Sequence, residues 1–302
     1  MALTTMRTMF VSQSRHGLAT GAVLASCASV QVGSALAARL MPFTGSEGAT
    51  MLRLCLAALG LLALSRPRVG SWSGMQWKSA LMLGLSLVGM NGCFYLALAR
   101  IPLGTAVTFE LVGPLTLSAV LSRRPRDLLW VGWALAGVVM LGGAPALRGD
   151  GLDPVGIAFA GAAGTFWALY ILATAKVGAH TPGLGGLAVA TAAAALVAIP
   201  FGLSGASVVL SHPELAGLAV GTALLASMIP YSLELGAMRS LSPKTFGVLL
   251  SLEPAVAALA GWLILGQAID GWGAVGIAMV ISASVGTTLT ASPRIEVEPA
   301  AA

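Results

Sequence analysis

The sequence predicts an all-α integral membrane protein with ten transmembrane helices in two inverted repeats of five. Hydrophobic residues make up 57% of the 302 positions and charged residues only 9%, whereas ordinary soluble domains have roughly 45–50% and about 25%. Apolar stretches of about 20 residues, the length that crosses a hydrocarbon core, recur along the whole chain. They lack the alternation of barrel strands, and in lipid a single segment satisfies its own backbone groups only as a helix.

Ten apolar stretches are long enough to be transmembrane helices, and they fall into two sets of five. The first set covers residues 17–40, 48–65, 79–99, 103–122 and 128–147. The second set covers residues 154–175, 184–203, 215–238, 245–267 and 271–290. We therefore divide the chain into an N-terminal tail (1–16), a first repeat (17–147), a second repeat (154–290) and a C-terminal tail (291–302). The first span exceeds the roughly 7–15 apolar residues of a signal peptide, so we expect it to stay in the mature protein.

The formal net charge of +5 does not indicate a nucleic-acid partner, because the cations mark one side of a membrane. If the amino terminus is cytoplasmic, twelve of the 16 lysines and arginines lie in cytoplasmic segments. They are Arg7, Arg15, Arg66, Arg68, Lys78, Arg123, Arg124, Arg126, Lys176, Arg239, Lys244 and Arg294. Cytoplasmic loops of membrane proteins carry such an excess, so both termini are expected to be cytoplasmic.

Each half contains a tight turn followed by a span with a proline near its middle. In the first half the turn begins at Arg100 and the proline is Pro114; in the second half they are Arg239 and Pro254. A five-helix unit repeated in tandem enters the membrane upside down the second time, and inverted repeats recur in secondary transporters. Together with Pro230, these prolines free backbone carbonyl groups inside the membrane, which favours helix breaks beside a cavity or a polar neighbour.

Four ionisable side chains lie within the expected spans: Arg53, Glu110, Glu234 and Glu253. Placing an arginine at a helix centre costs about 2.5–3.5 kcal/mol on insertion scales, so each charged group should face a partner or a wet cavity. Arg53 is either the ion-pair partner of a glutamate or a clamp for a substrate carboxylate, which the planar guanidinium fits. Glu110 can bind either a proton or an ammonium group.

Polar residues near these charges add further candidates. Tyr231 lies one turn before Glu234, so the phenol and the carboxylate share a helix face and either grip a polar ligand or hydrogen-bond each other. Glu253 precedes a proline and either satisfies the backbone groups that the proline frees or binds a ligand. Asn91 and Tyr95, four residues apart on the third span, either add hydrogen bonds to the site or join helices. We consider all of these residues candidates for binding substrate or coupling protons.

No metal and no cofactor is expected. Cys27, Cys55 and Cys93 all fall in apolar spans without metal-ligand spacing, and the three histidines lie outside the spans. The sequence has no nucleotide-binding loop or catalytic signature. Transport driven by an ion gradient, or downhill transport, is therefore favoured over transport driven by ATP.

Several segments resemble one known family. Residues 89–115, GMNGCFYLALARIPLGTAVTFELVGPL, residues 122–125, SRRP, and residues 229–235 and 245–255 in the second half are similar to the bacterial threonine and homoserine exporters. These belong to the EamA group of the drug/metabolite transporter superfamily, and the resemblance extends over nearly the whole of residues 17–290. It implies ten helices around a central cavity, a location in the inner membrane and the export of small amino acids. One departure is Leu265-Gly266-Gln267, where the family usually has Gly-Glu.

The resulting hypothesis is a secondary exporter of threonine, homoserine or similar zwitterions, working by alternating access and coupled to protons as an antiporter. Glu110 or Glu234 would hold the ammonium group or carry the proton, and Arg53 would hold the carboxylate. A broader drug or metabolite exporter is the main alternative. A membrane-embedded enzyme is disfavoured, because such enzymes cluster their acids, His or Cys near one interface, and the buried acids here are spread over three spans.

Overall fold

The computed structural model describes residues 2–122, 128–137, 140, 151–238, 250 and 252–290, and within these residues it contains helices and no strand. The longer helices are α1 (Ala2–Ser65), α2 (Gly74–Leu98), α3 (Leu103–Ser122), α5 (Pro154–His180), α6 (Gly185–Ala206), α11 (Glu253–Leu265) and α12 (Gly271–Thr290). The shorter ones are α7 (Val208–Ser211), α8 (Ala216–Ala223) and α9 (Ile229–Ala237), with the 3-10 turns η1 (Val69–Ser71) and η2 (Pro213–Leu215) and the π-helical segment η3 (Leu224–Met228). The expected all-α class is confirmed.

Helix α1 doubles back on itself at Gly45. This glycine has φ 69° and ψ 170°, a conformation reserved for residues without a side chain. Gly33, before it, packs against Ala226, and Arg53, after it, hydrogen-bonds the carbonyl of the same Ala226. In a straight helix these two positions would be about 30 Å apart, so α1 is a hairpin of two arms. The turn falls in the gap left between the first two expected spans.

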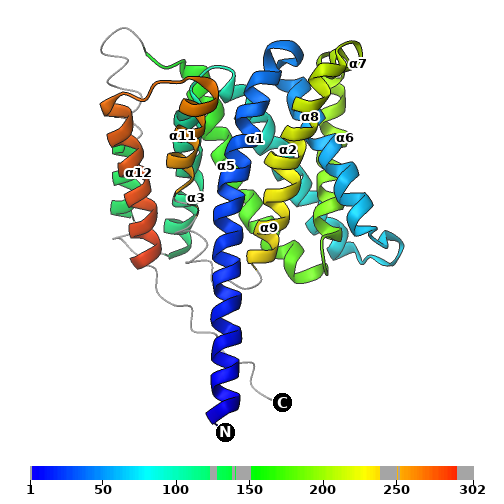
Figure 1. Cartoon of the computed structure of the whole chain (residues 1–302), viewed down its shortest axis with the longest axis vertical. Coiled ribbons are helices and arrows are strands. Elements are labelled where there is room, and N and C mark those ends of the chain that lie inside the picture. Colours follow the sequence, from blue (N-terminus) through cyan, green and yellow to red (C-terminus); the bar gives the residue numbers. More distant parts are fainter. Residues whose placement is uncertain are drawn as a thin grey trace.

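The chain then runs back and forth between two ends of the bundle. At one end the side chain of Gln76, in the first turn of α2, donates to the carbonyl of His180, the last residue of α5, over 2.9 Å. At the other end Arg100, just after α2, forms an ion pair of 3.5 Å with Asp153, just before α5. Helices α2 and α5 are therefore antiparallel neighbours. Figure 1 shows α3, α11 and α12 together on one side of the bundle and α6, α7 and α8 on the other, with α1 between them.

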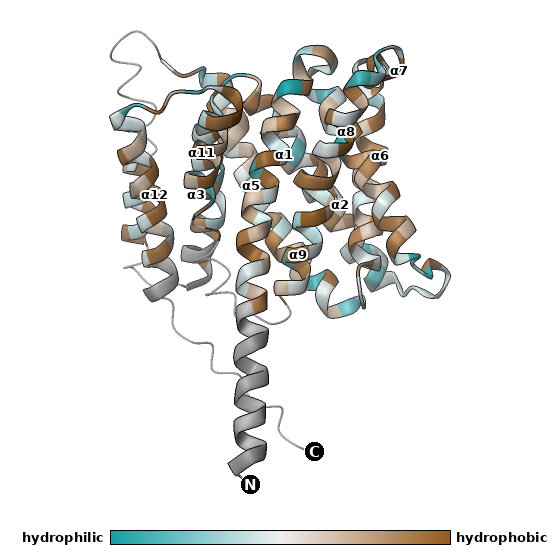
Figure 2. Ribbon diagram, in the orientation of Figure 1, coloured by the Kyte–Doolittle hydropathy of each residue, from teal (hydrophilic) through white to brown (hydrophobic). Residues whose placement is uncertain are grey.

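The exterior of the bundle is apolar, as a lipid-facing surface requires. Leu210, Leu18 and Phe201 are 86%, 75% and 71% exposed, whereas large apolar patches are rare on soluble monomers. In Figure 2 hydrophobic residues extend along the height of the helices, and hydrophilic residues gather mainly toward the two ends. The protein is therefore an integral membrane protein.

Five segments among the described residues are long and apolar enough to cross a membrane. They are Leu18–Ser65, Gly74–Leu98, Pro154–His180, Gly185–Ala206 and Pro213–Ala237. Shorter apolar helices occupy Leu103–Leu117, Leu128–Gly137, Glu253–Leu265 and Gly271–Ala283. Parts of the expected spans 128–147 and 245–267 lie outside the described residues, so the expectation of ten helices is not decided by these segments.

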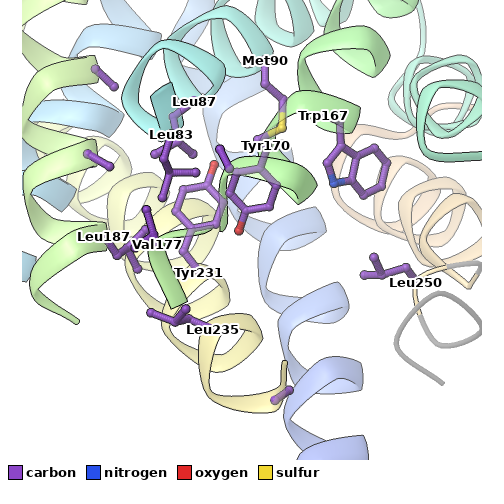
Figure 3. Packing of buried hydrophobic residues seen from close by; sticks show 14 of the residues in the cluster. Leu83, Leu87, Met90, Trp167, Tyr170, Val177, Leu187, Tyr231, Leu235 and Leu250 are labelled. Carbon is purple, nitrogen blue, oxygen red and sulfur yellow. The ribbon is translucent and has the colours of Figure 1, made fainter. Parts of the chain in front are cut away.

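Two apolar clusters form the interior. One contains Leu54, Leu83 and Tyr231 and lies between the two arms of α1 and the helices α2, α5 and α9. Figure 3 shows part of it, with the rings of Tyr170 and Tyr231 beside each other. The other contains Tyr95 and Val107 and lies toward the opposite end of α2. Polar residues gather where the two clusters meet, and they define the candidate site.

Candidate functional site

A cavity lies within the bundle and is lined by residues of both apolar clusters and by buried charges. Its empty volume is about 510 Å³, a figure that includes space open to solvent. The lining residues are Val30, Gln31, Ser34, Arg53, Met90, Asn91, Phe94, Val107, Glu110, Trp167, Tyr170, Tyr231, Glu234 and Glu253. Helices α1, α2, α3, α5, α9 and α11 therefore all contribute to one site.

Arg53 is the buried cation of this cavity, with only 2% of its surface exposed. Its Nε donates to Ser227 Oγ over 2.7 Å and its Nη2 donates to Tyr231 OH over 3.1 Å and to the carbonyl of Ala226. The guanidinium carbon also lies 5.2 Å from the ring centroid of Tyr95, within cation–π range. No carboxylate of the described residues forms an ion pair with Arg53.

A break in the helical hydrogen bonds between α8 and α9, where the backbone continues through the π-helical segment η3, explains the acceptors around Arg53. Pro230, the second residue of α9, has no N–H, so the carbonyl of Ala226 loses its α-helical donor and that of Leu225 its π-helical donor. Side chains replace both: Arg53 donates to Ala226, and Ser29 Oγ donates to Leu225 over 2.7 Å. Both arms of α1 are thus bonded to the break that Pro230 creates.

Glu234 is held by two hydroxyl groups from other helices. Ser26 Oγ donates to its Oε1 over 2.6 Å, and Tyr170 OH donates to its Oε2 over 3.3 Å. The neighbouring Tyr231 does not bond to Glu234; its hydroxyl lies 3.1 Å from both Oδ1 and Nδ2 of Asn91. Of the two expected alternatives, the hydrogen bond between phenol and carboxylate is therefore not formed, and both groups line the cavity.

The other two carboxylates have few partners. Glu253 is 6% exposed, and its Oε1 lies 3.9 Å from the thiol of Cys27, a weak donor. Glu110 is 9% exposed and makes no side-chain hydrogen bond or ion pair to another described residue. Because both line the cavity, their carboxyl groups are available to a ligand or a proton.

Two glycines bring Glu110 to the cavity by letting α3 and α5 touch. A side-chain carbon added to Gly113 or to Gly164 would clash with the backbone of the other helix, in the case of Gly164 with Glu110 itself. Such close approach of helices through small residues is typical of membrane bundles. Pro114 lies inside α3 next to this contact, while Pro254 is the second residue of α11.

The structure thus brings Arg53, Asn91, Glu110, Tyr231, Glu234 and Glu253 to one cavity, with Tyr95 stacked behind Arg53. Sequence reasoning missed Ser26, Gln31, Ser34, Trp167 and Tyr170. Neutral polar and aromatic side chains cost little inside a span, so their presence in an apolar stretch gave no signal comparable to that of a buried charge. Among the described residues no group of three or more His, Cys, Asp or Glu could hold a metal ion.

A helical membrane bundle around an internal cavity with one cation and three carboxylates is the architecture of a membrane transporter. Residues 154–289 match the model of the EamA-like transporter family. The threonine/homoserine exporter RhtA of Salmonella typhimurium (strain SL1344) is 40% identical over 89% of this chain and 90% of its own. RhtA of Escherichia coli (strain K12) is 39% identical over the same shares. The chain belongs to the EamA-like transporter family.

A crystal structure also matches, with a TM-score of 0.59 and 20% identity over 90% of this chain and 97% of that chain. This similarity supports the fold alone. Family membership identifies the protein as a multi-pass membrane transporter, and a membrane-embedded enzyme is thereby excluded.

Proposed function

We propose that this protein exports threonine, homoserine or similar small amino acids across the bacterial inner membrane by secondary transport. The observation that carries the proposal is the 39–40% identity, over nearly the full length of both chains, to proteins named threonine/homoserine exporters. The charges in the cavity agree with it, because a zwitterion needs both a cation and an anion in a site that otherwise excludes charge.

Arg53 binds the substrate carboxylate in this proposal. The guanidinium lines the cavity and forms no ion pair with a carboxylate of the described residues. A carboxylate arriving there would gain charge-assisted hydrogen bonds. Glu110, which faces the cavity without a partner, binds the ammonium group from the α3 side.

Binding of substrate would be communicated to the fold through the helix formed by α8, η3 and α9, at the interrupted hydrogen bonds beside Pro230. A carboxylate on Arg53 competes with the carbonyl of Ala226 for the guanidinium, so binding changes the support of the break at Pro230. We propose alternating access on this basis, between two inverted repeats of five helices (17–147 and 154–290). Glu234 and Glu253 are proposed to carry the coupling proton of an antiporter, since buried carboxyl groups of this kind form proton relays in transporters.

The orientation follows from the positive-inside rule. Gln76 meets His180 and Pro67 packs against Gly185 at one end of the bundle, which also contains Arg66 and Arg68. We propose that this end, and with it both termini, faces the cytoplasm.

The test is the export of labelled threonine and homoserine from cells that produce the wild-type chain or the Glu110→Gln variant at equal membrane abundance. Strong export by the wild type and little by the variant is expected. If the wild type exports neither amino acid, the proposal is wrong, and a panel of drugs and metabolites would then test for a broader exporter. In sealed vesicles, threonine transport that neither responds to a pH gradient nor moves protons would refute the coupling.

A further inference from the structure

Gln31 presents an unpaired amide to the cavity. The residue lies in the first arm of α1, is 3% exposed and lines the cavity beside Arg53 and Glu110. Its Oε1 is buried and has no hydrogen-bond partner, and no described residue bonds its Nε2. Buried amide groups are nearly always paired, because an unsatisfied one destabilises the structure. The Gln31 amide is therefore able to hydrogen-bond a ligand in the cavity.

Ser34 extends this neutral patch. It follows Gln31 by three residues, which places both side chains on one face of the helix. Ser34 is 1% exposed, lines the same cavity and makes no side-chain hydrogen bond to the described residues. The two side chains together offer both donors and acceptors and carry no charge.

The chemistry of the proposed substrates leaves one group for this patch. Their carboxylate matches Arg53 and their ammonium matches Glu110, since each pair has opposite charges. The remaining polar group of threonine and homoserine is a neutral hydroxyl, which needs one acceptor and one donor. We infer that the Gln31–Ser34 patch binds the side-chain hydroxyl of the transported amino acid and makes the exporter selective for hydroxylated substrates. This inference rests on the proposed function.

The size of the expected selectivity follows from the Gln31 amide, which would stay unpaired when an analogue without the hydroxyl binds. 2-Aminobutyrate has the carbon skeleton of both threonine and homoserine but lacks the hydroxyl, so its binding would enclose the Gln31 amide without a partner. A site built to bond a hydroxyl discriminates strongly against the analogue that lacks it. We expect wild-type affinity for threonine to exceed that for 2-aminobutyrate roughly tenfold or more, as for a buried acceptor that loses its partner.

The experiment measures competition of threonine and 2-aminobutyrate for transport of labelled threonine in proteoliposomes. The Gln31→Met variant keeps the length of the side chain and removes the amide. We expect its affinities for threonine and 2-aminobutyrate to lie within about threefold of each other. The change should be mainly a lower affinity for threonine, because the lost hydrogen bond is made to threonine only. Ser34→Ala should act in the same direction. Thr222→Val is the matched control, because the Thr222 hydroxyl is equally buried and unpaired but does not line the cavity.

The outcomes separate the inference from the proposed function. Wild-type protein that transports threonine but binds 2-aminobutyrate equally well overturns the inference and leaves amino-acid export standing, and this arm needs no variant. If the variants lose affinity for both compounds by the same factor, Gln31 has a structural role and the inference is also overturned. Wild-type protein that transports neither compound refutes the proposed function and the inference together.

Discussion

Replacing Arg53 by methionine should abolish transport while leaving the protein folded. The variant loses three hydrogen bonds, to Ser227, Ala226 and Tyr231. Hydrogen bonds between helices in membranes contribute about 0.6 kcal/mol each, so the loss is roughly 2 kcal/mol. Removing a buried arginine also relieves an insertion cost of about 2.5–3.5 kcal/mol. The two effects nearly cancel, and the free energy of unfolding should change by no more than about 1–2 kcal/mol.

The effect on substrate binding is much larger, because methionine cannot hydrogen-bond the substrate carboxylate. Two charge-assisted hydrogen bonds from a guanidinium to a carboxylate contribute about 1.5–3 kcal/mol each. Their loss weakens binding by a factor of about 10²–10⁴, at about 1.4 kcal/mol for each factor of ten. Stability and transport should therefore respond very differently to the same substitution.

The assay compares threonine uptake by proteoliposomes with the thermal unfolding of the same purified samples. Arg39→Met is the matched control: Arg39 also donates to a backbone carbonyl, that of Ile264, but it does not line the cavity. We expect the control to transport at the wild-type KM. Uptake by Arg53→Met at the wild-type KM, or a loss of stability that parallels the loss of uptake, would refute the reasoning.

Further predictions concern other residues of the cavity and the helices that hold them. Glu110→Gln should raise the KM for threonine about tenfold or more, because it removes the partner of the ammonium group. Glu234→Gln should abolish the response of uptake to a pH gradient and retain substrate binding. The opposite pattern would exchange the roles of the two glutamates. Pro230→Ala restores an N–H that competes with Arg53 for a backbone carbonyl, so turnover should fall while the unfolding temperature rises. Gly164→Ala should reduce uptake by separating α3 from α5, and Gly161→Ala, one turn earlier with open space around it, should not.

The parts of the site that could be predicted from the sequence are the parts that cost free energy in a membrane. A charged side chain in an apolar span requires an explanation, and Arg53, Glu110, Glu234 and Glu253 all line one cavity. Their functional roles stay predictions. The same argument did not predict the hydrogen-bond partners of these side chains, because the packing that sets the distance between two spans could not be derived from the sequence. The bond between Tyr170 and Glu234 joins residues 64 positions apart on different helices.

The local sequence pattern predicted features of the backbone, but it did not predict which side chains contact the backbone carbonyl groups. Pro230 lies two residues after the end of a π-helical segment, and the proline explains why carbonyl groups lack helical donors there. Which side chains would take up those carbonyls did not follow from the sequence. Ser29 and Arg53 are 24 residues apart on two arms of one hairpin, and the turn at Gly45 brings them to the same break.

The neutral surroundings of Arg53 fit the requirements of a carrier better than an ion pair would. A carboxylate from the protein would neutralise the guanidinium and have to be displaced by every substrate, at a cost comparable to the binding it enables. The observed acceptors are a serine hydroxyl, a tyrosine hydroxyl and the backbone carbonyl of Ala226. They hold the cation in place without an ion pair, so an incoming carboxylate does not have to displace a carboxylate of the protein. Since one of these acceptors is the Ala226 carbonyl that Pro230 leaves without a helical donor, the residue that we propose to bind the substrate also bonds the helix at this point.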